Sequence, residues 1–144
     1  KRRNGNECFG CCGALDDPYR FTQEDMKWYL DWLFVRGVNM IYPHAFYYSL
    51  RGKRKYERPP EVGMHSGFWE DYRRVTDYIK RMCSLLTDSV NQAQVAVLCG
   101  AQDLSWEIVN PLFENQIEFN YLEEELLPNC RVENGKLCLQ NQAY

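Results

Sequence analysis

Two segments in the first half of the chain repeat hydrophobic residues at helical spacing. In residues 22–37, the apolar side chains that would share one helix face are Met26, Tyr29, Leu30 and Leu33. The sequence Thr-Gln-Glu-Asp at 22–25 has the form of a capping box, and Gly37 is of the type that often follows a helix end. We therefore predict a helix between Thr22 and Gly37.

The second segment, residues 68–86, has a complete amphipathic pattern. Its apolar face would contain Phe68, Tyr72, Val75, Ile79, Met82 and Leu86. Its solvated face would contain Asp71, Arg74, Asp77 and Arg81. This pattern predicts a second helix that packs on a core through one side.

Short apolar runs predict strands beside these helices. The run VNMIY at 38–42 has the continuous hydrophobicity of a strand buried on both faces, and the run VAVLC at 95–99 predicts a further buried strand. A further helix is predicted over 105–117, with Pro111 in its first turns or at a kink. Because helices alternate with apolar strands, the sequence favours an α/β architecture.

The last part of the chain predicts shorter elements. Residues 119–127 favour a short helical or extended segment that Pro128 ends. The Asn-Gly pair at 134–135 lies between two alternating runs, 131–133 and 136–139, which is typical of a β-hairpin. Between 43 and 66, by contrast, no period is sustained, and loops of this length in compact domains are usually functional or disordered.

Charge divides the 144 residues into two parts. Residues 1–88 contain 15 basic and 12 acidic residues, whereas residues 89–144 contain 2 basic and 8 acidic ones. This change from +3 to −6 predicts two domains, 1–88 and 89–144. Hydrophobic residues at 45% and aromatic residues at 15% exclude a disordered or collagen-like chain.

Several classes of protein find no support in the sequence. No run of about 18 apolar residues is present, so we expect no transmembrane helix and no membrane partner. The basic start KRRNGN lacks the apolar stretch of a signal peptide. Seven irregularly spaced cysteines disfavour a secreted disulfide framework and lean towards a reducing, cytoplasmic compartment. The ECFGCC cluster lacks the ligand spacing of a zinc site, so we expect no metal and no cofactor.

The residues alone leave the candidate chemistry open. His44, Tyr47 and Tyr48 follow the predicted strand 38–42 at its carboxyl end, where α/β folds place their sites. His44 is equally a structural histidine on this pattern. Glu7 would lie in a loop before the first helix, as a surface carboxylate or as one of the two carboxyls that glycoside hydrolysis needs. Weaker carboxylate candidates are Asp16, Asp17 and Glu57.

A basic run interleaved with tyrosines lies in the long loop. Its cations are Arg51, Lys53, Arg54, Lys55 and Arg58, and the tyrosines are Tyr48 and Tyr56. It is either a solvated loop or a surface for an acidic partner. Because the chain as a whole is acidic and the run is confined to one loop, we do not expect nucleic acid as the partner.

The run MKWYLDWLFVRGVNMIYPHAFYYSLRGKRKYERPP, followed by GFWEDYRRVTDYIKRMCSLLTDS and QVAVLCG, resembles a group of large bacterial glycoside hydrolases, family 2-like or α-L-rhamnosidase family 106-like. The resemblance implies the end of a (β/α)8 barrel over residues 1–88, followed by the first βα units of a flavodoxin-like domain over 89–144. It also implies a carbohydrate substrate.

The resemblance further implies roles for single residues. Glu7, after the seventh barrel strand, would be the nucleophile or second carboxylate, although KRRNGN stands where that strand is expected. The residues that would bind the sugar are His44, Tyr47, Tyr48, Arg51 and Trp69. We expect Glu7, His44 and Tyr47 at one end of the layer, with Glu7 and His44 less than roughly 15 Å apart, the length of a short helix.

Two expectations concern the isolated chain. No partner carboxylate from an earlier barrel strand is present, so the chain alone should be an incomplete catalyst. Part of a barrel leaves apolar strand faces uncovered, so we expect self-association or association with missing segments. The alternative function is a non-catalytic α/β interaction module that binds an acidic partner through loop 51–58.

Overall fold

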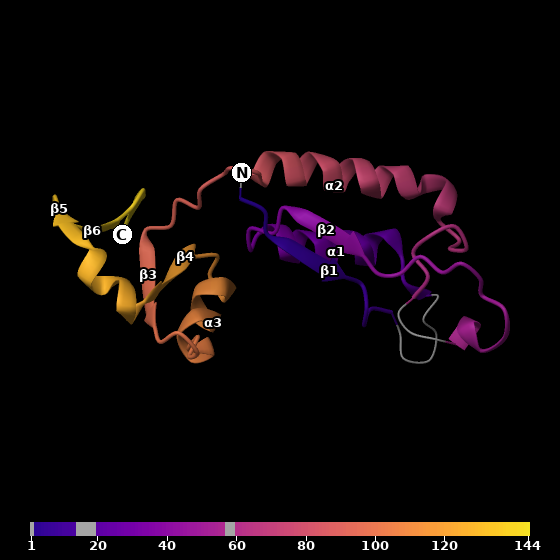
Figure 1. The fold of residues 1–144 in the computed structure, drawn as a ribbon, viewed down its shortest axis with the longest axis horizontal. Coiled ribbons are helices and arrows are strands. Elements are labelled where there is room, and N and C mark those ends of the chain that lie inside the picture. Colours follow the sequence, from indigo (N-terminus) through magenta and orange to yellow (C-terminus); the bar gives the residue numbers. More distant parts are fainter. Residues whose placement is uncertain (1, 14–19, 57–59) are drawn as a thin grey trace. The chain divides into compact units, whose positions relative to one another are not determined.

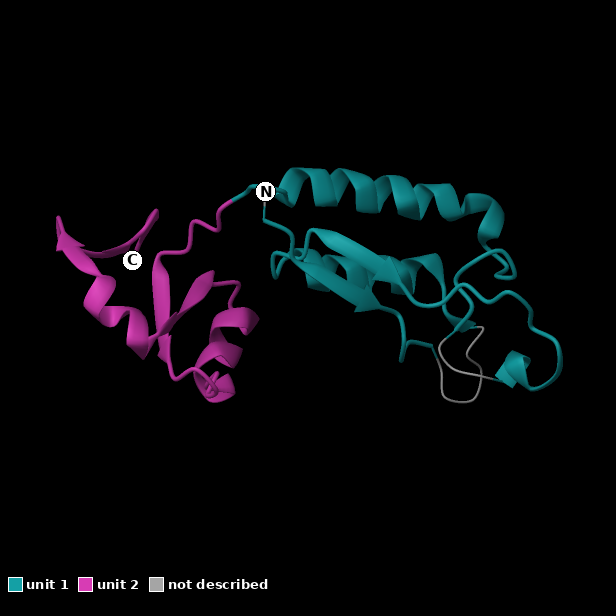
Figure 2. Ribbon diagram, in the orientation of Figure 1, with its two compact units in different colours: residues 1–89 teal, residues 90–144 magenta. Residues whose placement is uncertain are grey.

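The computed structural model describes residues 2–13, 20–56 and 60–144. The chain divides into two compact units, Lys1–Ser89 and Val90–Tyr144 (Figure 2). This division lies one residue from the position at which the charge changes sign along the sequence. Both units combine helices with parallel strand pairs, so the fold is broadly α/β.

Helix α1 (Gln23–Phe34) confirms the first predicted helix. The capping box is formed: the Asp25 N–H donates to Thr22 Oγ1 at 3.2 Å, and the Thr22 N–H donates to Asp25 Oδ2 at 2.9 Å. The helix buries Met26, Leu30, Leu33 and Phe34. The predicted helix face included Tyr29, which is exposed, and did not include Phe34, which is buried.

The second predicted helix is also confirmed. A 3-10 helix, η3 (Trp69–Asp71), leads into α2 (Tyr72–Leu86) (Figure 1). The predicted apolar face packs against the core of the first unit, with Tyr72 and Val75 buried and Ile79 partly buried. Exposed ion pairs lie on the opposite side, including Arg74 Nε to Asp71 Oδ1 at 3.5 Å.

Strands β1 (Gly5–Cys8) and β2 (Met40–Pro43) form a parallel pair with α1 in the connection between them. The sequence analysis placed Glu7 in a loop, and this was wrong, because Glu7 lies within β1 opposite Tyr42. The short GNEC segment lacks the apolar run of a predicted strand. Its extended conformation depends on hydrogen bonding to β2, a partner more than 30 residues away in the sequence.

The core of the first unit lies against one face of these strands. Cys8 is buried in it, and Ile41 packs against it. Gly5, Glu7 and Tyr42 alternate onto the other face, where Tyr42 is 52% exposed. The prediction that this strand is buried on both faces was therefore wrong: α1 and α2 cover a single face.

The second unit begins with a parallel pair that is also joined by a helix. The elements are β3 (Val95–Cys99), α3 (Trp106–Glu114) and β4 (Phe119–Glu123). Strand 95–99 is confirmed, although Leu98 is 46% exposed and the strand is buried on one side only. Helix α3 is shorter than the predicted 105–117, and Pro111 lies inside it.

The end of the second unit contains a three-stranded antiparallel sheet. The 3-10 helix η4 (Glu124–Asn129) continues through Pro128, which therefore does not end it as predicted. Strands β5 (Arg131–Glu133) and β6 (Lys136–Leu139) form the predicted hairpin, and a short strand, β7 (Gln142–Ala143), adds to it. Asn134 and Gly135 have positive φ angles of 51° and 77°, as a type I′ turn requires.

Within the described ranges, none of the helices combines the length and the apolar character needed to cross a membrane.

Candidate functional site

Glu7 and His44 are in direct contact on the exposed face of the first unit. His44 Nδ1 lies 2.8 Å from Glu7 Oε1, and the two side chains are 42% and 68% exposed, respectively. The strand ladder produces this contact, because Glu7 is opposite Tyr42 and the His44 N–H donates to Cys8 O at 2.9 Å. The two residues are thus far closer than the 15 Å that the sequence analysis allowed.

The Glu7–His44 pair lies at the carboxyl ends of two parallel strands. Glu7 is the third residue of β1, and His44 directly follows β2. In α/β folds this edge of the sheet is where ligands bind, because the connections to the following helices open there. In this pair the Glu7 carboxylate accepts a hydrogen bond from the His44 imidazole, and both side chains are accessible to solvent.

The backbone next to Glu7 adopts a rarely populated conformation. Phe9, two residues after Glu7, has a φ angle of 75°. Its ring is 3% exposed and packs on Phe21 with centroids 5.3 Å apart, which holds the backbone in this conformation. For a bulky residue such a conformation costs of the order of 1–3 kcal/mol, and such costs cluster at functional sites.

The buried groups below the Glu7–His44 pair are held in their neutral forms. Burial raises the pKa of the Cys8 thiol to about 12, and the neighbouring Cys12 and Glu7 contribute further. Burial likewise raises the pKa of Tyr72 to about 12, with a further contribution from Cys8. Neither group is a nucleophile near neutral pH.

Among the other predicted sugar-binding residues, Tyr47 and Tyr48 follow His44 in the chain, and Trp69 lies in η3. Tyr47 is partly buried, and its backbone N–H is bonded to a carboxylate, that of Glu61. Tyr48 is 95% exposed. Trp69 stacks on Tyr72 with ring centroids 5.4 Å apart, contacts Phe46 and is 43% exposed.

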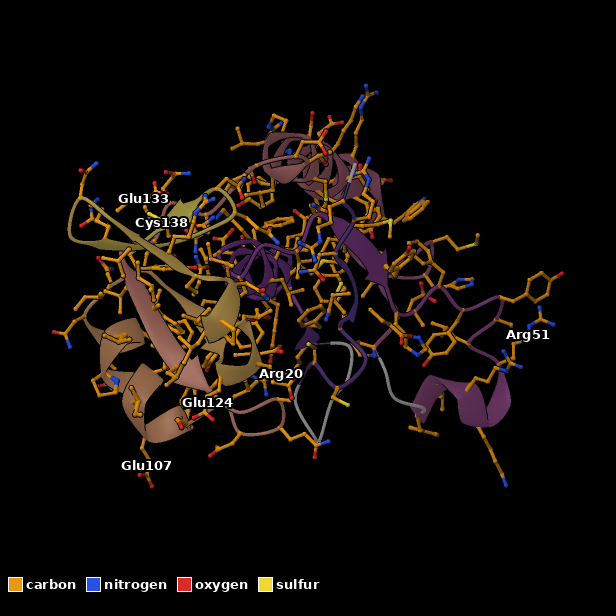
Figure 3. The ribbon with its side chains drawn as sticks, turned by 60° about the vertical axis from the view of Figure 1, so that its left-hand side comes forward. Arg20, Arg51, Glu107, Glu124, Glu133 and Cys138 are labelled. Carbon is orange, nitrogen blue, oxygen red and sulfur yellow. The ribbon has the colours of Figure 1, made fainter. Side chains whose placement is uncertain are left out.

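Arg51 and the other described cations of the basic loop lie away from the strands. Arg51 is at the outer edge of the loop, beside the 3-10 helix η2 (Gly52–Tyr56) (Figure 3). Lys53, Arg54 and Lys55 occupy η2 itself and are fully on the surface. Arg58, together with the weaker carboxylate candidates Asp16, Asp17 and Glu57, lies outside the described residues.

Glu61 is a site residue that the sequence analysis missed. It is 3% exposed, and its carboxylate accepts hydrogen bonds from the backbone of Tyr47 and of Gly63. A glutamate in the Pro-Pro-Glu-Val-Gly sequence has the appearance of an exposed loop residue. The signal in the sequence is its position between two apolar residues, Pro60 and Val62, and the structure buries both.

Among the described residues, no group of three or more His, Cys, Asp and Glu side chains is placed to hold a metal ion.

Comparison of the chain with family models, with curated proteins and with solved structures gives no match.

Proposed function

We propose that the chain is part of a glycoside hydrolase and that Glu7 is one of its two catalytic carboxylates. In this proposal residues 1–88 are the end of a (β/α)8 barrel, and residues 89–144 are the start of a flavodoxin-like domain. Hydrolysis of a glycosidic bond needs two carboxyl groups, one as acid and the other as nucleophile or base. The second carboxylate would come from a barrel strand outside this chain.

The arrangement of the first unit supports the barrel part of this proposal. Parallel strands β1 and β2, with α1 between them and α2 after them, have the order of two consecutive β/α units. In a (β/α)8 barrel the helices cover the outer face of the strands, and catalytic side chains come from strand ends at the carboxyl side. The bare strand face with Glu7 and Tyr42 would correspond to the barrel interior.

The observation that carries the proposal is the 2.8 Å contact between Glu7 and His44 at the strand ends. His44 Nδ1 would orient the carboxylate and leave its other oxygen for the anomeric carbon or a water molecule. Trp69 and Tyr48 would offer apolar ring faces to the sugar, since aromatic side chains combine an apolar face with a polar tip.

The test measures sugar binding by the chain itself. Saturation-transfer NMR with a panel of aryl glycosides, including α-L-rhamnosides, is expected to detect binding. Glu7→Gln should weaken it about 10-fold or more, because hydrogen bonds to a charged group contribute roughly 1.5–3 kcal/mol. Glu70→Gln, which neutralises an exposed carboxylate of η3, is the matched control and should bind as the parent does.

Two results would contradict the proposal: no binding of any glycoside, or equal binding by the parent and Glu7→Gln. Hydrolysis of an aryl glycoside by this chain alone would instead overturn the claim that a second carboxylate is missing.

A second candidate function rests on the exposed basic loop. We propose as the alternative that loop 51–58 binds an acidic partner and that the chain is a non-catalytic interaction module. Arg51 and the three cations of η2 lie within five residues, beside Tyr48 and Tyr56, which are 95% and 74% exposed. Closely spaced cations with exposed aromatic rings suit a polyanion, whose charges can bind several of them at once.

Retention on heparin at increasing salt separates the two functions. The module predicts strong retention at low salt that disappears as salt rises, since the interaction is electrostatic. A variant with Arg51, Lys53, Arg54 and Lys55 changed to Gln should elute at much lower salt. The matched control removes four exposed cations of α2, namely Arg73, Arg74, Lys80 and Arg81. Equal loss of retention in both variants would show only an effect of net charge and would contradict the module.

A further inference from the structure

Glu61 is a buried carboxylate with a hydrogen bond to each oxygen. Oε2 accepts from the Tyr47 backbone N–H at 2.7 Å, and Oε1 accepts from the Gly63 backbone N–H. Its side chain is enclosed, with 3% of the residue exposed. Glutamate is rarely buried to this extent, because removing a carboxylate from water is costly unless fixed donors replace the lost hydration.

The two hydrogen bonds fasten the start of the long loop to its end. Two backbone contacts lie beside them: the Val62 N–H donates to Ala45 O at 2.9 Å, and the Ala45 N–H donates to Pro60 O at 3.5 Å. Residues 45–47 and 60–63 therefore form a narrow neck. The segment that leaves strand β2, and that begins with His44, is held in place from the far end of the loop.

Packing in the neck leaves no space for a side chain at position 63. A Cβ atom on Gly63 would lie 2.3 Å from the Phe46 ring and 2.5 Å from Glu61 Oε1. The Phe46 ring in turn makes an edge contact with Tyr72, with centroids 5.8 Å apart. The backbone at 63 and the carboxylate are therefore fitted to each other, and the neck rests on the core of the unit.

The chemistry of the neck selects a carboxylate over an amide. Two backbone donors need two acceptor atoms, and a glutamine offers one carbonyl oxygen and one NH2 donor. Glutamine at this position would leave one buried N–H without an acceptor and would face it with a donor. An apolar residue would leave both N–H groups unsatisfied.

We propose that Glu61 is a positioning residue for the candidate sugar site. It holds the segment from His44 to Tyr47 in the conformation that places His44 against Glu7, and it acts through the backbone of that segment. Because it is enclosed and both oxygens are occupied, it does not itself contact the substrate. The assignment to sugar binding rests on the proposed function, whereas the positioning of the Glu7–His44 pair does not.

The test measures the coupling between Glu7 and His44 by NMR. The chain has two histidines, so His65→Gln identifies which ring signals belong to His44. In the parent, Glu7→Gln should displace the His44 ring signals, since the two side chains are in contact. In the Glu61→Gln background the same change should displace them by less than half as much. The matched control is Glu70→Gln, an exposed carboxylate, which should leave the displacement unchanged.

A purely structural role would give a different result. Glu61→Gln would then lower the melting temperature while the Glu7-dependent displacement of the His44 signals stayed at its parental size, and this outcome would overturn the proposal. If Glu61→Gln does not fold, Gly63→Ala provides the second variant. It keeps the carboxylate but places a methyl group against Glu61 Oε1 and the Phe46 ring, and it should reduce the same displacement.

The measurement requires no sugar, so it fails independently of the proposed function. Loss of coupling in Glu61→Gln without glycoside binding by the parent would support the positioning role and reject the sugar. Glycoside binding with full coupling in Glu61→Gln would support the sugar site and reject the positioning role.

Discussion

At the scale of single residues, the candidate site joins one exposed pair to a set of neutral buried groups. Glu7 and His44 are open to solvent and in contact. The Cys8 thiol and the Tyr72 hydroxyl lie buried below, and burial is the main reason that the pKa of each is raised to about 12. The site therefore presents one acidic group to a ligand, and the groups behind it stay uncharged over the physiological pH range.

Tyr72 leads to a prediction about stability. Its hydroxyl is buried and has no hydrogen-bond partner among the described residues. Tyr72→Phe removes this unsatisfied group while keeping the ring, so we expect the free energy of unfolding to rise by about 1 kcal/mol. Tyr78→Phe is the matched control, since the Tyr78 hydroxyl donates to Asp31 Oδ1. Because the control removes a hydrogen bond, its free energy of unfolding should fall by about 1 kcal/mol.

The same residue predicts a pH dependence. The pKa of Tyr72 is raised on folding from its usual 10.0 to about 12. The folded chain therefore holds this proton more tightly than the unfolded chain, and the resulting stability is lost as the pH rises from 10 towards 12. Urea unfolding at several pH values should show that the free energy of unfolding falls less at alkaline pH for Tyr72→Phe than for the parent. An identical fall in both would contradict the raised pKa of Tyr72.

At the scale of elements, local patterns predicted those parts whose partners lie close in the sequence. The capping box at the start of α1, the apolar face of α2 and the Asn134-Gly135 turn are all present as predicted. Each depends on backbone geometry or side-chain spacing within a few residues.

The elements that were missed depend on distant partners. Strand β1 has a polar, glycine-containing sequence and is extended only because it pairs with β2. Glu61 is buried because the neck folds over it, although its sequence context is that of a loop. In these cases a tertiary interaction decides the local structure, and the hydrophobic pattern of the sequence does not predict it.

At the scale of the whole molecule, apolar side chains remain uncovered in both units. Trp28 and Trp32 of α1 and its C-cap residue Val35 are spaced to share one face and are 63%, 47% and 69% exposed. In the second unit Trp106 and Ile108 are also more than half exposed. The acidic residues of that unit are all exposed, Glu107 among them (Figure 3). Apolar side chains grouped on one face usually mark contact surfaces, whereas single exposed ones are normal.

We therefore predict that the isolated chain self-associates. Sedimentation velocity should show species larger than the monomer that increase with protein concentration. The double variant Trp28→Gln/Val35→Gln should shift the distribution towards the monomer. Leu85→Gln, which changes an apolar side chain on α2 that is 70% exposed, serves as the control and should have little effect. A parent chain that remains monomeric at all concentrations would contradict the prediction.

The sequence by itself determined the helices α1 and α2, the strand β3, the final hairpin and the alternation typical of an α/β chain, because these follow from local spacing and turn chemistry. It also singled out Glu7 and His44, which are 37 positions apart, and the family resemblance placed them at one end of the layer without predicting a direct contact. Only the tertiary structure decided that they touch, since the register of β1 against β2 brings their side chains together. It likewise decided that Glu61 is buried, because a carboxylate is enclosed only where folding supplies donors to both of its oxygens.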